Sequence, residues 1–200
     1  MVSTFAKSFF RSLVWWRTAA ALILAGFVAV SASEQSNAEP QYGAVIDQAY
    51  LNVPYDRQQT QVWCWVAAAR MVAQYYNVAT PSQCQMLTAQ YGAPCCQNPA
   101  MCTRPGHISE IQALVASFGL RYSTIGPPTD GWTLLNIFKS GRPIILHVNN
   151  SHFVVASGIR VVQTPQGPLG IVQILDPYVG VYEEALPSLY QRWGAAMYVY

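Results

Sequence analysis

The sequence predicts an α+β domain in which helices form the first half and an antiparallel sheet forms the second. From Trp65 to Tyr76 only Arg70 and Gln74 are strongly polar, and neither Pro nor Gly interrupts the run. Because those two residues are four apart, they lie on one narrow stripe, which is typical of a helix buried on nearly all sides. After Pro143 the pattern changes to short apolar runs separated by turn residues, which predicts strands. Helices followed by strands are the pattern of an α+β domain.

Shorter elements are expected on both sides of the long helix. A strand-like run over 50–54 is stopped by its own final proline, and a short helix is expected from Ser82. Apolar residues at helical spacing predict two more helices, over 109–118 and over 134–139. The expected strands are 144–148, 153–157, 170–175 and 197–200. A cleft between the helical half and the strand half is where a binding site is expected.

Composition excludes two classes of protein. The 200-residue chain is 52% hydrophobic but only 10% charged, and its net charge is +2. An electrostatic nucleic-acid binder needs a strong excess of basic residues, and a disordered chain is poor in apolar ones. No Gly-rich phosphate loop is present. We therefore expect one folded domain with no nucleic-acid partner and no cofactor.

The beginning of the chain has the features of a signal peptide. Three basic residues precede an uninterrupted apolar run over 19–30, which suits the core of a signal peptide and is short for a membrane span. Cleavage is expected after Ala32 or Ala38, and a retained membrane anchor is the alternative. We expect residues 1–38 to be a signal peptide with a short linker, and residues 39–200 to be the folded domain.

Export would place the mature chain outside the cytoplasm, secreted or periplasmic and free of the membrane, in an oxidising environment where disulfides persist. Four cysteines cluster in a segment rich in Pro and Gly. A disulfide between the adjacent Cys95 and Cys96 is strained, so we expect Cys84 to pair with one of them and Cys102 with the other. A zinc site that includes His107 is the alternative, but the spacing lacks a CxxC pair and we expect no metal.

Cys64 is separate from this cluster, between Trp63 and Trp65, where a polar segment gives way to the long apolar helix. It is therefore expected in the first turn of that helix. Free backbone N–H groups and the positive end of the helix dipole favour an anion there, such as a thiolate. Gln58 lies six residues earlier, close enough to fold back and place its amide beside the sulfur. The alternative is that Cys64 is a packing residue of the core.

His152 and Asp176 are expected to meet at one end of the sheet. His152 follows the polar turn 149–151 at the start of a strand, and Asp176 stands at the end of the next strand. If these strands pair through the turn at 164–167, the first residue of one lies opposite the last residue of the other. A carboxylate beside an imidazole fixes its tautomer and stabilises its cation, which in turn holds a nearby thiol as thiolate. Each residue alone is explained by its turn, but with Cys64 they indicate a catalytic site.

The sequence resembles the papain-like cysteine peptidases. The resemblance rests on Gln-x5-Cys-Trp at a buried helix start, a strand-initial His-Phe-Val-Val, and Asp-Pro at a strand end. It extends from Val53 to about Tyr178 and is closest to compact bacterial branches, namely secreted effector proteases and peptidases that trim bacteriocin leaders. It implies a papain-like fold with the nucleophile on a central helix. The positions that match the family's catalytic residues are Cys64 as nucleophile, His152 as general base, Asp176 as orienting acid and Gln58 in the oxyanion hole.

The activity implied by this resemblance is hydrolysis of peptide bonds in a protein or peptide substrate. Two alternatives have different chemistry. One is a thiol-dependent acyl or peptide transferase on the same fold, in which an amine resolves the thioester. The other is a non-catalytic binding module stapled by disulfides, in which Cys64 is buried and inert. Of the remaining histidines, His107 is expected in the loop before a helix and His147 on a face of the sheet.

The cysteine pattern gives a first prediction. In a non-reducing digest of the mature protein, the four clustered cysteines should appear in two disulfides. Cys64 should remain free and should react fastest with iodoacetamide, since it is expected at a helix start near His152. Peptide mapping by mass spectrometry measures both properties. Recovery of Cys64 in an intramolecular disulfide from an active preparation would contradict its role as nucleophile.

Overall fold

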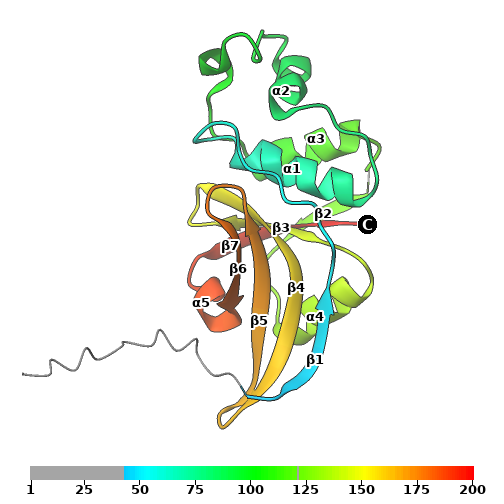
Figure 1. The fold of residues 1–200 in the computed structure, drawn as a ribbon, viewed down its shortest axis with the longest axis vertical. Helices are drawn as coiled ribbons and strands as arrows, with labels where there is room; N and C mark the ends of the chain where they lie inside the picture. Colours follow the sequence, from blue (N-terminus) through cyan, green and yellow to red (C-terminus); the bar gives the residue numbers. More distant parts are fainter. Residues whose placement is uncertain (1–42, 121) are drawn as a thin grey trace, which may run out of the picture. The chain divides into compact units, whose positions relative to one another are not determined.

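The computed structural model of the chain describes residues 43–120 and 122–200 (Figure 1). The expected signal peptide, residues 1–38, lies outside the described residues. Within the described part, most helices precede most strands, which confirms the predicted α+β order. The elements in chain order are β1 (Val45–Tyr50), α1 (Cys64–Tyr75), α2 (Gln83–Tyr91), the 3-10 helix η1 (Pro99–Cys102), α3 (Ile108–Ser117), β2 (Ser123–Gly126), α4 (Gly131–Lys139), β3 (Ile144–Val148), β4 (His152–Thr164), β5 (Gly167–Asp176), β6 (Gly180–Ala185), α5 (Leu186–Tyr190) and β7 (Trp193–Val199).

Helix α1 is the centre of the helical half. It begins at Cys64, so the predicted place of this cysteine in the first turn is confirmed. The helix is buried on nearly every side, and Arg70 is its first residue that is not buried. The small side chains of Ala67, Ala68 and Ala69 favour the helical conformation and let neighbouring elements approach closely. Those neighbours are α2, α3, β3 and β4.

In the described part of the chain, seven strands form one antiparallel sheet in the order β2-β7-β3-β4-β5-β6, and β1 pairs with the second half of β4. Helices α1, α2 and α3 gather at the end of the sheet where β4 begins and β5 ends (Figure 1). Strand side chains alternate between two cores. Phe153 and Val155 belong to the core of α1–α3, whereas Val154 and Ala156 pack with residues of α4 and α5.

The expected helices and the four later strands are present, but some shorter elements were not predicted. The prediction of a strand over 50–54 is wrong, since β1 ends at Tyr50 and no regular element includes 51–58. Leu51 nevertheless donates its backbone N–H to the carbonyl of Ser157 at 2.7 Å, so the chain still follows the sheet there. Strands β2 and β6 and helix α5 were also not predicted, because they are short and carry little apolar periodicity. No helix in the described ranges has the length and apolar character that a bilayer span requires.

Two disulfides join the cysteine cluster, in one of the two arrangements that the sequence left open. Cys84 of α2 pairs with Cys96, and Cys95 pairs with Cys102 of η1. Cys64 is the free cysteine of the chain and is buried. The disulfides therefore tie the loop after α2 to both of its flanking helices, and they leave the thiol of α1 unpaired.

Candidate active site

The thiol of Cys64 lies at the start of α1. As the first residue of the helix it is next to backbone N–H groups that have no partner inside the helix. The preceding residue, Trp63, is buried, and its indole N–H donates to the carbonyl of Cys102 at 3.1 Å. This contact joins the start of α1 to the Cys95–Cys102 disulfide. The position of the sulfur is therefore set by the core of the helical half.

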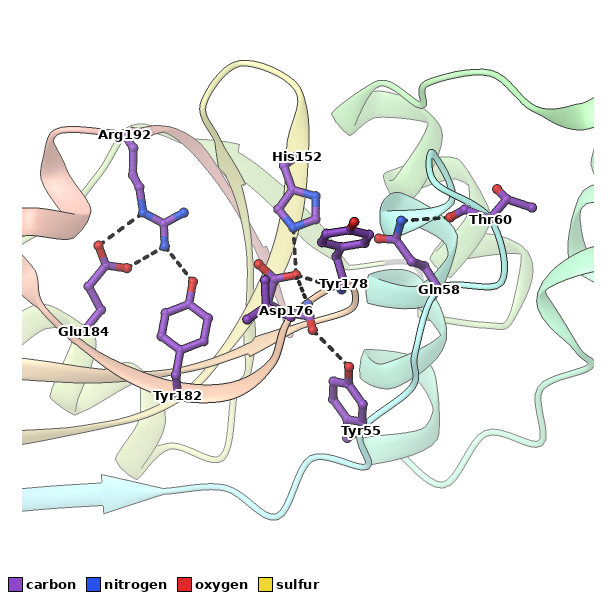
Figure 2. A network of polar contacts seen from close by, with 10 residues as sticks. Tyr55, Gln58, Thr60, His152, Asp176, Tyr178, Tyr182, Glu184 and Arg192 are labelled. Carbon is purple, nitrogen blue, oxygen red and sulfur yellow. Dashed lines mark hydrogen bonds and ion pairs between the residues drawn. The ribbon is translucent and has the colours of Figure 1, made fainter. Parts of the chain in front are cut away.

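His152 and Asp176 form the polar contact that the sequence predicted. The distance from His152 Nε2 to Asp176 Oδ1 is 2.9 Å (Figure 2). The same carboxylate oxygen accepts backbone N–H groups from Tyr178 at 2.8 Å and from Val179 at 3.2 Å. Asp176 is only 4% exposed, so these donors replace the water that a buried carboxylate loses. The turn after β5 thus holds the carboxylate at a fixed place beneath the imidazole.

A β-bulge in β4 brings the two side chains to the same face of the sheet. Ile159 pairs with Val172, but Ala156 pairs with Ile174, so Ser157 is an extra residue in β4. When this shifted register is continued, Asp176 lies across from residue 154, two residues after His152 and on the same face. Without the extra residue, Asp176 would lie across from residue 155, and His152 would point to the opposite face. The predicted meeting is therefore diagonal and depends on the bulge.

The pKa values of the pair are shifted apart. Burial lowers the pKa of His152, but the hydrogen bond to Asp176 and the interaction with the Cys64 thiol raise it, and together they place it at about 9, above the ordinary 6.5. Burial raises the pKa of the Asp176 carboxyl, whereas the His152 hydrogen bond and the backbone N–H of Tyr178 lower it, with a net lowering. The arrangement therefore favours a protonated imidazole beside a carboxylate at neutral pH.

The turn that leads into His152 is anchored by Arg192 and its partners Glu184 and Tyr182, which the sequence did not indicate. Asn149 and Asn150 have positive φ angles of 53° and 56°, a conformation that asparagine tolerates better than most residues. The backbone N–H of Asn149 donates to the carbonyl of Arg192 at 2.8 Å. The Arg192 guanidinium in turn binds Glu184 and donates to the Tyr182 hydroxyl at 2.7 Å (Figure 2). No motif signals these contacts, because they join β6 and the residue before β7 to a turn far earlier in the chain.

Gln58 also lies near this end of the sheet, in the segment between β1 and α1. Its backbone N–H donates to the carbonyl of Pro177 at 3.0 Å, directly after Asp176. Its side-chain Nε2 donates to the carbonyl of Thr60 at 2.8 Å, while Oε1 is buried and has no hydrogen-bond partner among the described residues. Figure 2 shows the amide nitrogen turned to Thr60 and the amide oxygen turned to the side of Tyr178. The side chain is thus placed near the site, with its oxygen rather than its nitrogen facing it.

A pocket of about 230 Å³ adjoins Gln58. Its lining residues all have polar side chains, and only Arg57 among them carries a charge. The Tyr55 hydroxyl donates to the backbone carbonyl of Asp176 at 3.1 Å. The lining residues are Arg57, Gln58, Gln59, Thr60, Gln61 and Tyr178. The pocket therefore lies on the side of the site that Gln58 occupies.

The other two histidines have the positions expected of structural residues. The His147 ring stacks on Phe153 with 4.5 Å between ring centroids, and burial lowers its pKa. His107 precedes α3, where its Nδ1 lies 2.9 Å from the hydroxyl of Ser109. In the described ranges, no cluster of three or more His, Cys, Asp or Glu side chains could hold a metal ion.

The helical half, the antiparallel sheet and the thiol at the start of α1 define a papain-like cysteine peptidase. The family described as papain-like cysteine protease AvrRpt2 matches residues 47–192, and the chain belongs to it. Among solved structures, it is similar to a double glycine motif protease from an AMS/PCAT transporter in complex with the leader peptide. That match has 16% identity and a TM-score of 0.52, and it covers 78% of this chain and 96% of the other.

A second solved structure, described as a C39-like peptidase from Bacillus anthracis, gives the same fold. It is 16% identical, with a TM-score of 0.50 and coverage of 77% of this chain and 98% of the other. No curated protein sequence matches the chain. At this level of identity the two structures support the fold, whereas the family match supports the class of enzyme.

The shifted pKa of His152 gives a second prediction. In NMR spectra of protein labelled at histidine, the His152 ring should titrate near pH 9, because it contacts the Asp176 carboxylate, and the His147 ring should titrate below 6.5, because burial lowers its pKa. Asp176→Asn should move the His152 midpoint to lower pH. The folded pKa of His152 exceeds the unfolded value of about 6.5. The contact therefore stabilises the fold fully below about pH 6.5, and this stabilisation is lost as the pH rises through about 9. A His152 midpoint at or below 6.5 would contradict the assignment.

Proposed function

We propose that the protein hydrolyses peptide bonds with Cys64 as nucleophile, His152 as general acid and base, Asp176 as the residue that orients His152, and Gln58 in the oxyanion hole. The observation that carries this proposal is the position of the His152 ring. It hydrogen-bonds Asp176 at 2.9 Å and interacts with the thiol of Cys64, the first residue of α1. A nucleophile, a base and a group that orients the base are the groups that this chemistry uses.

The reaction proceeds through a thioester. The Cys64 thiolate attacks the carbonyl carbon of the scissile bond, and the carbonyl oxygen becomes an oxyanion. When the intermediate collapses, the C–N bond breaks and His152 gives its proton to the departing amine. Neutral His152 then takes a proton from water, whose oxygen attacks the thioester. The C–S bond breaks, the acid product leaves, and the thiolate and the imidazolium are restored.

The oxyanion needs two donors. The backbone N–H of Cys64 at the start of α1 supplies one, and the Gln58 amide supplies the other. In the structure Nε2 gives one of its two N–H groups to the Thr60 carbonyl, and the amide oxygen faces the site, so a rotation of the side chain would present the second N–H to the oxyanion. Loss of one such donor typically costs about 100- to 1000-fold in rate.

We further propose that the substrate is an extended peptide segment. One of the similar structures is a protease bound to a leader peptide, which is consistent with this class of substrate. The pocket beside Gln58 would take residues on one side of the scissile bond, since it adjoins the proposed oxyanion hole. Its lining is mostly uncharged and polar, so we expect it to accept polar side chains.

Export is also part of the proposal. The two disulfides are consistent with an oxidising compartment, and residues 1–38 carry the features of a signal peptide. The protein would then act outside the cytoplasm as residues 39–200 or a slightly longer chain. The peptide map of the exported protein also tests this proposal, because a chain that still begins at Met1 contradicts cleavage.

A third prediction concerns the histidines. His152→Ala should lower peptide hydrolysis to the level of Cys64→Ala, because it removes the base and the acid in one step. His147→Ala and His107→Ala are the matched controls, since each removes an imidazole outside the proposed triad. The measurement is hydrolysis of an internally quenched peptide, normalised to the folded fraction. Loss of activity in His147→Ala with activity retained in His152→Ala would reverse the assignment.

A fourth prediction separates Asp176 from Gln58. Asp176→Asn removes the charge that holds the His152 proton, so it should shift the pH profile of iodoacetamide inactivation as well as lower turnover. Gln58→Ala acts only when the oxyanion forms, so it should leave inactivation almost unchanged and lower turnover about 100-fold or more. Both variants are measured by inactivation and turnover across pH. Wild-type turnover in Gln58→Ala would assign the hole to other groups, and an unchanged inactivation profile in Asp176→Asn would reduce the triad to a pair.

A further inference from the structure

The backbone on both sides of Gln58 is held by one buried amide from another helix. Gln83, in the first turn of α2, is only 1% exposed. Its Nε2 donates to the carbonyl of Arg57 at 2.8 Å, and its Oε1 accepts the backbone N–H of Gln59 at 3.0 Å. Nε2 also donates to Asp56 Oδ2 at 2.8 Å. Both N–H groups and the carbonyl of this side chain are therefore used on the segment that carries Gln58.

Asp56 ties the same segment to α1. Its Oδ1 pairs with the Arg70 guanidinium at 2.9 Å, and Arg70 Nε donates to the carbonyl of Pro81 at 2.9 Å, just before α2. The Gln58 backbone N–H is bound in turn to Pro177. The backbone around Gln58 therefore has polar attachments to α1, to α2 and to the residue after Asp176. The Gln58 side chain is held separately, by its hydrogen bond to the Thr60 carbonyl.

The start of α2 is itself well fixed. The Ser82 backbone N–H donates to the Gln85 side-chain oxygen at 2.9 Å in a capping box, which gives a donor at the start of the helix its partner. Cys84, the residue after Gln83, is bonded to Cys96. Gln83 therefore projects from a rigid turn, which is what a positioning residue requires.

We propose that Gln83 is a positioning residue for the oxyanion hole, which it serves by holding the Arg57–Gln59 backbone so that the Gln58 amide reaches the reacting carbonyl. The inference rests on the proposed function, because it assigns Gln83 a role only through Gln58. A small misplacement of an oxyanion donor costs rate, since the donor must lie about 3 Å from the oxygen. A purely structural Gln83 would instead affect the amount of folded protein, with little effect on the rate of each folded site.

A double-mutant cycle distinguishes these roles. The four proteins are the wild type, Gln83→Met, Gln58→Ala and the double variant, and their active sites are counted by titration with a thiol-directed covalent inhibitor. The probe is an internally quenched peptide, selected from a randomised library because the wild type cleaves it. We expect Gln83→Met to lower kcat about 10-fold or more with little change in KM or in iodoacetamide inactivation. In the Gln58→Ala background the same substitution should cause no further loss of kcat.

Gln90→Met is the matched control, because it makes the same change at an exposed position of the same helix. Urea unfolding reports the stability of each variant. Equal losses of kcat from Gln83→Met in both backgrounds would overturn the inference, as would unchanged kcat per active site. If Gln58→Ala itself has wild-type kcat while Cys64→Ala is inactive, the proposed oxyanion role fails first and the inference fails with it.

A second pair of variants covers the case in which Gln83→Met does not fold. Gln83→Glu keeps the acceptor for Gln59 but places a carboxylate against Asp56, so kcat should fall. Adding Asp56→Asn restores a donor to that contact and returns the local charge to that of the wild type, so it should recover part of the lost kcat with inactivation by iodoacetamide unaltered. Failure of Asp56→Asn to recover any kcat in folded protein would also overturn the inference.

Discussion

The hydrogen bond between His152 and Asp176 is the interaction on which the rest of the site depends. It exists because β4 contains one residue more than β5 between the hairpin turn and the site, which brings the two side chains to one face. Ser157, the extra residue, is fully buried, and its hydroxyl donates to Gln173 at 2.8 Å. The sheet therefore supplies the orientation of the imidazole that the proposed mechanism requires, and the start of α1 supplies the thiol.

Burial and polar contacts are balanced closely around this pair. Asp176 is almost inaccessible to solvent, but three donors share one of its oxygens. That arrangement keeps the carboxylate charged and so keeps the proton on His152. The strand start is held from the other side, where the carbonyl of Arg192 receives the N–H of Asn149. The site is thus positioned by backbone and side-chain contacts from β5, β6 and β7 together.

The proposed oxyanion hole combines a rigid part with a movable part. The backbone of the Gln58 segment is held by Gln83 and Pro177, yet the Gln58 amide is bound to Thr60 with its oxygen towards the site. Turning the amide costs one hydrogen bond, roughly 1 kcal/mol net, which is small beside the stabilisation that an oxyanion donor gives.

The sequence by itself determined the features that depend on local patterns. The apolar run after Cys64 predicted a buried helix with the thiol at its start, and the polar turn before His152 predicted a strand start, because burial periodicity and turn residues are local signals. Only the tertiary structure decided the bulge at Ser157, the pairing of Cys84 with Cys96, and the contacts of Gln83. Each of these joins residues that are distant in the chain, and their geometry is fixed only when the strands and helices pack against one another.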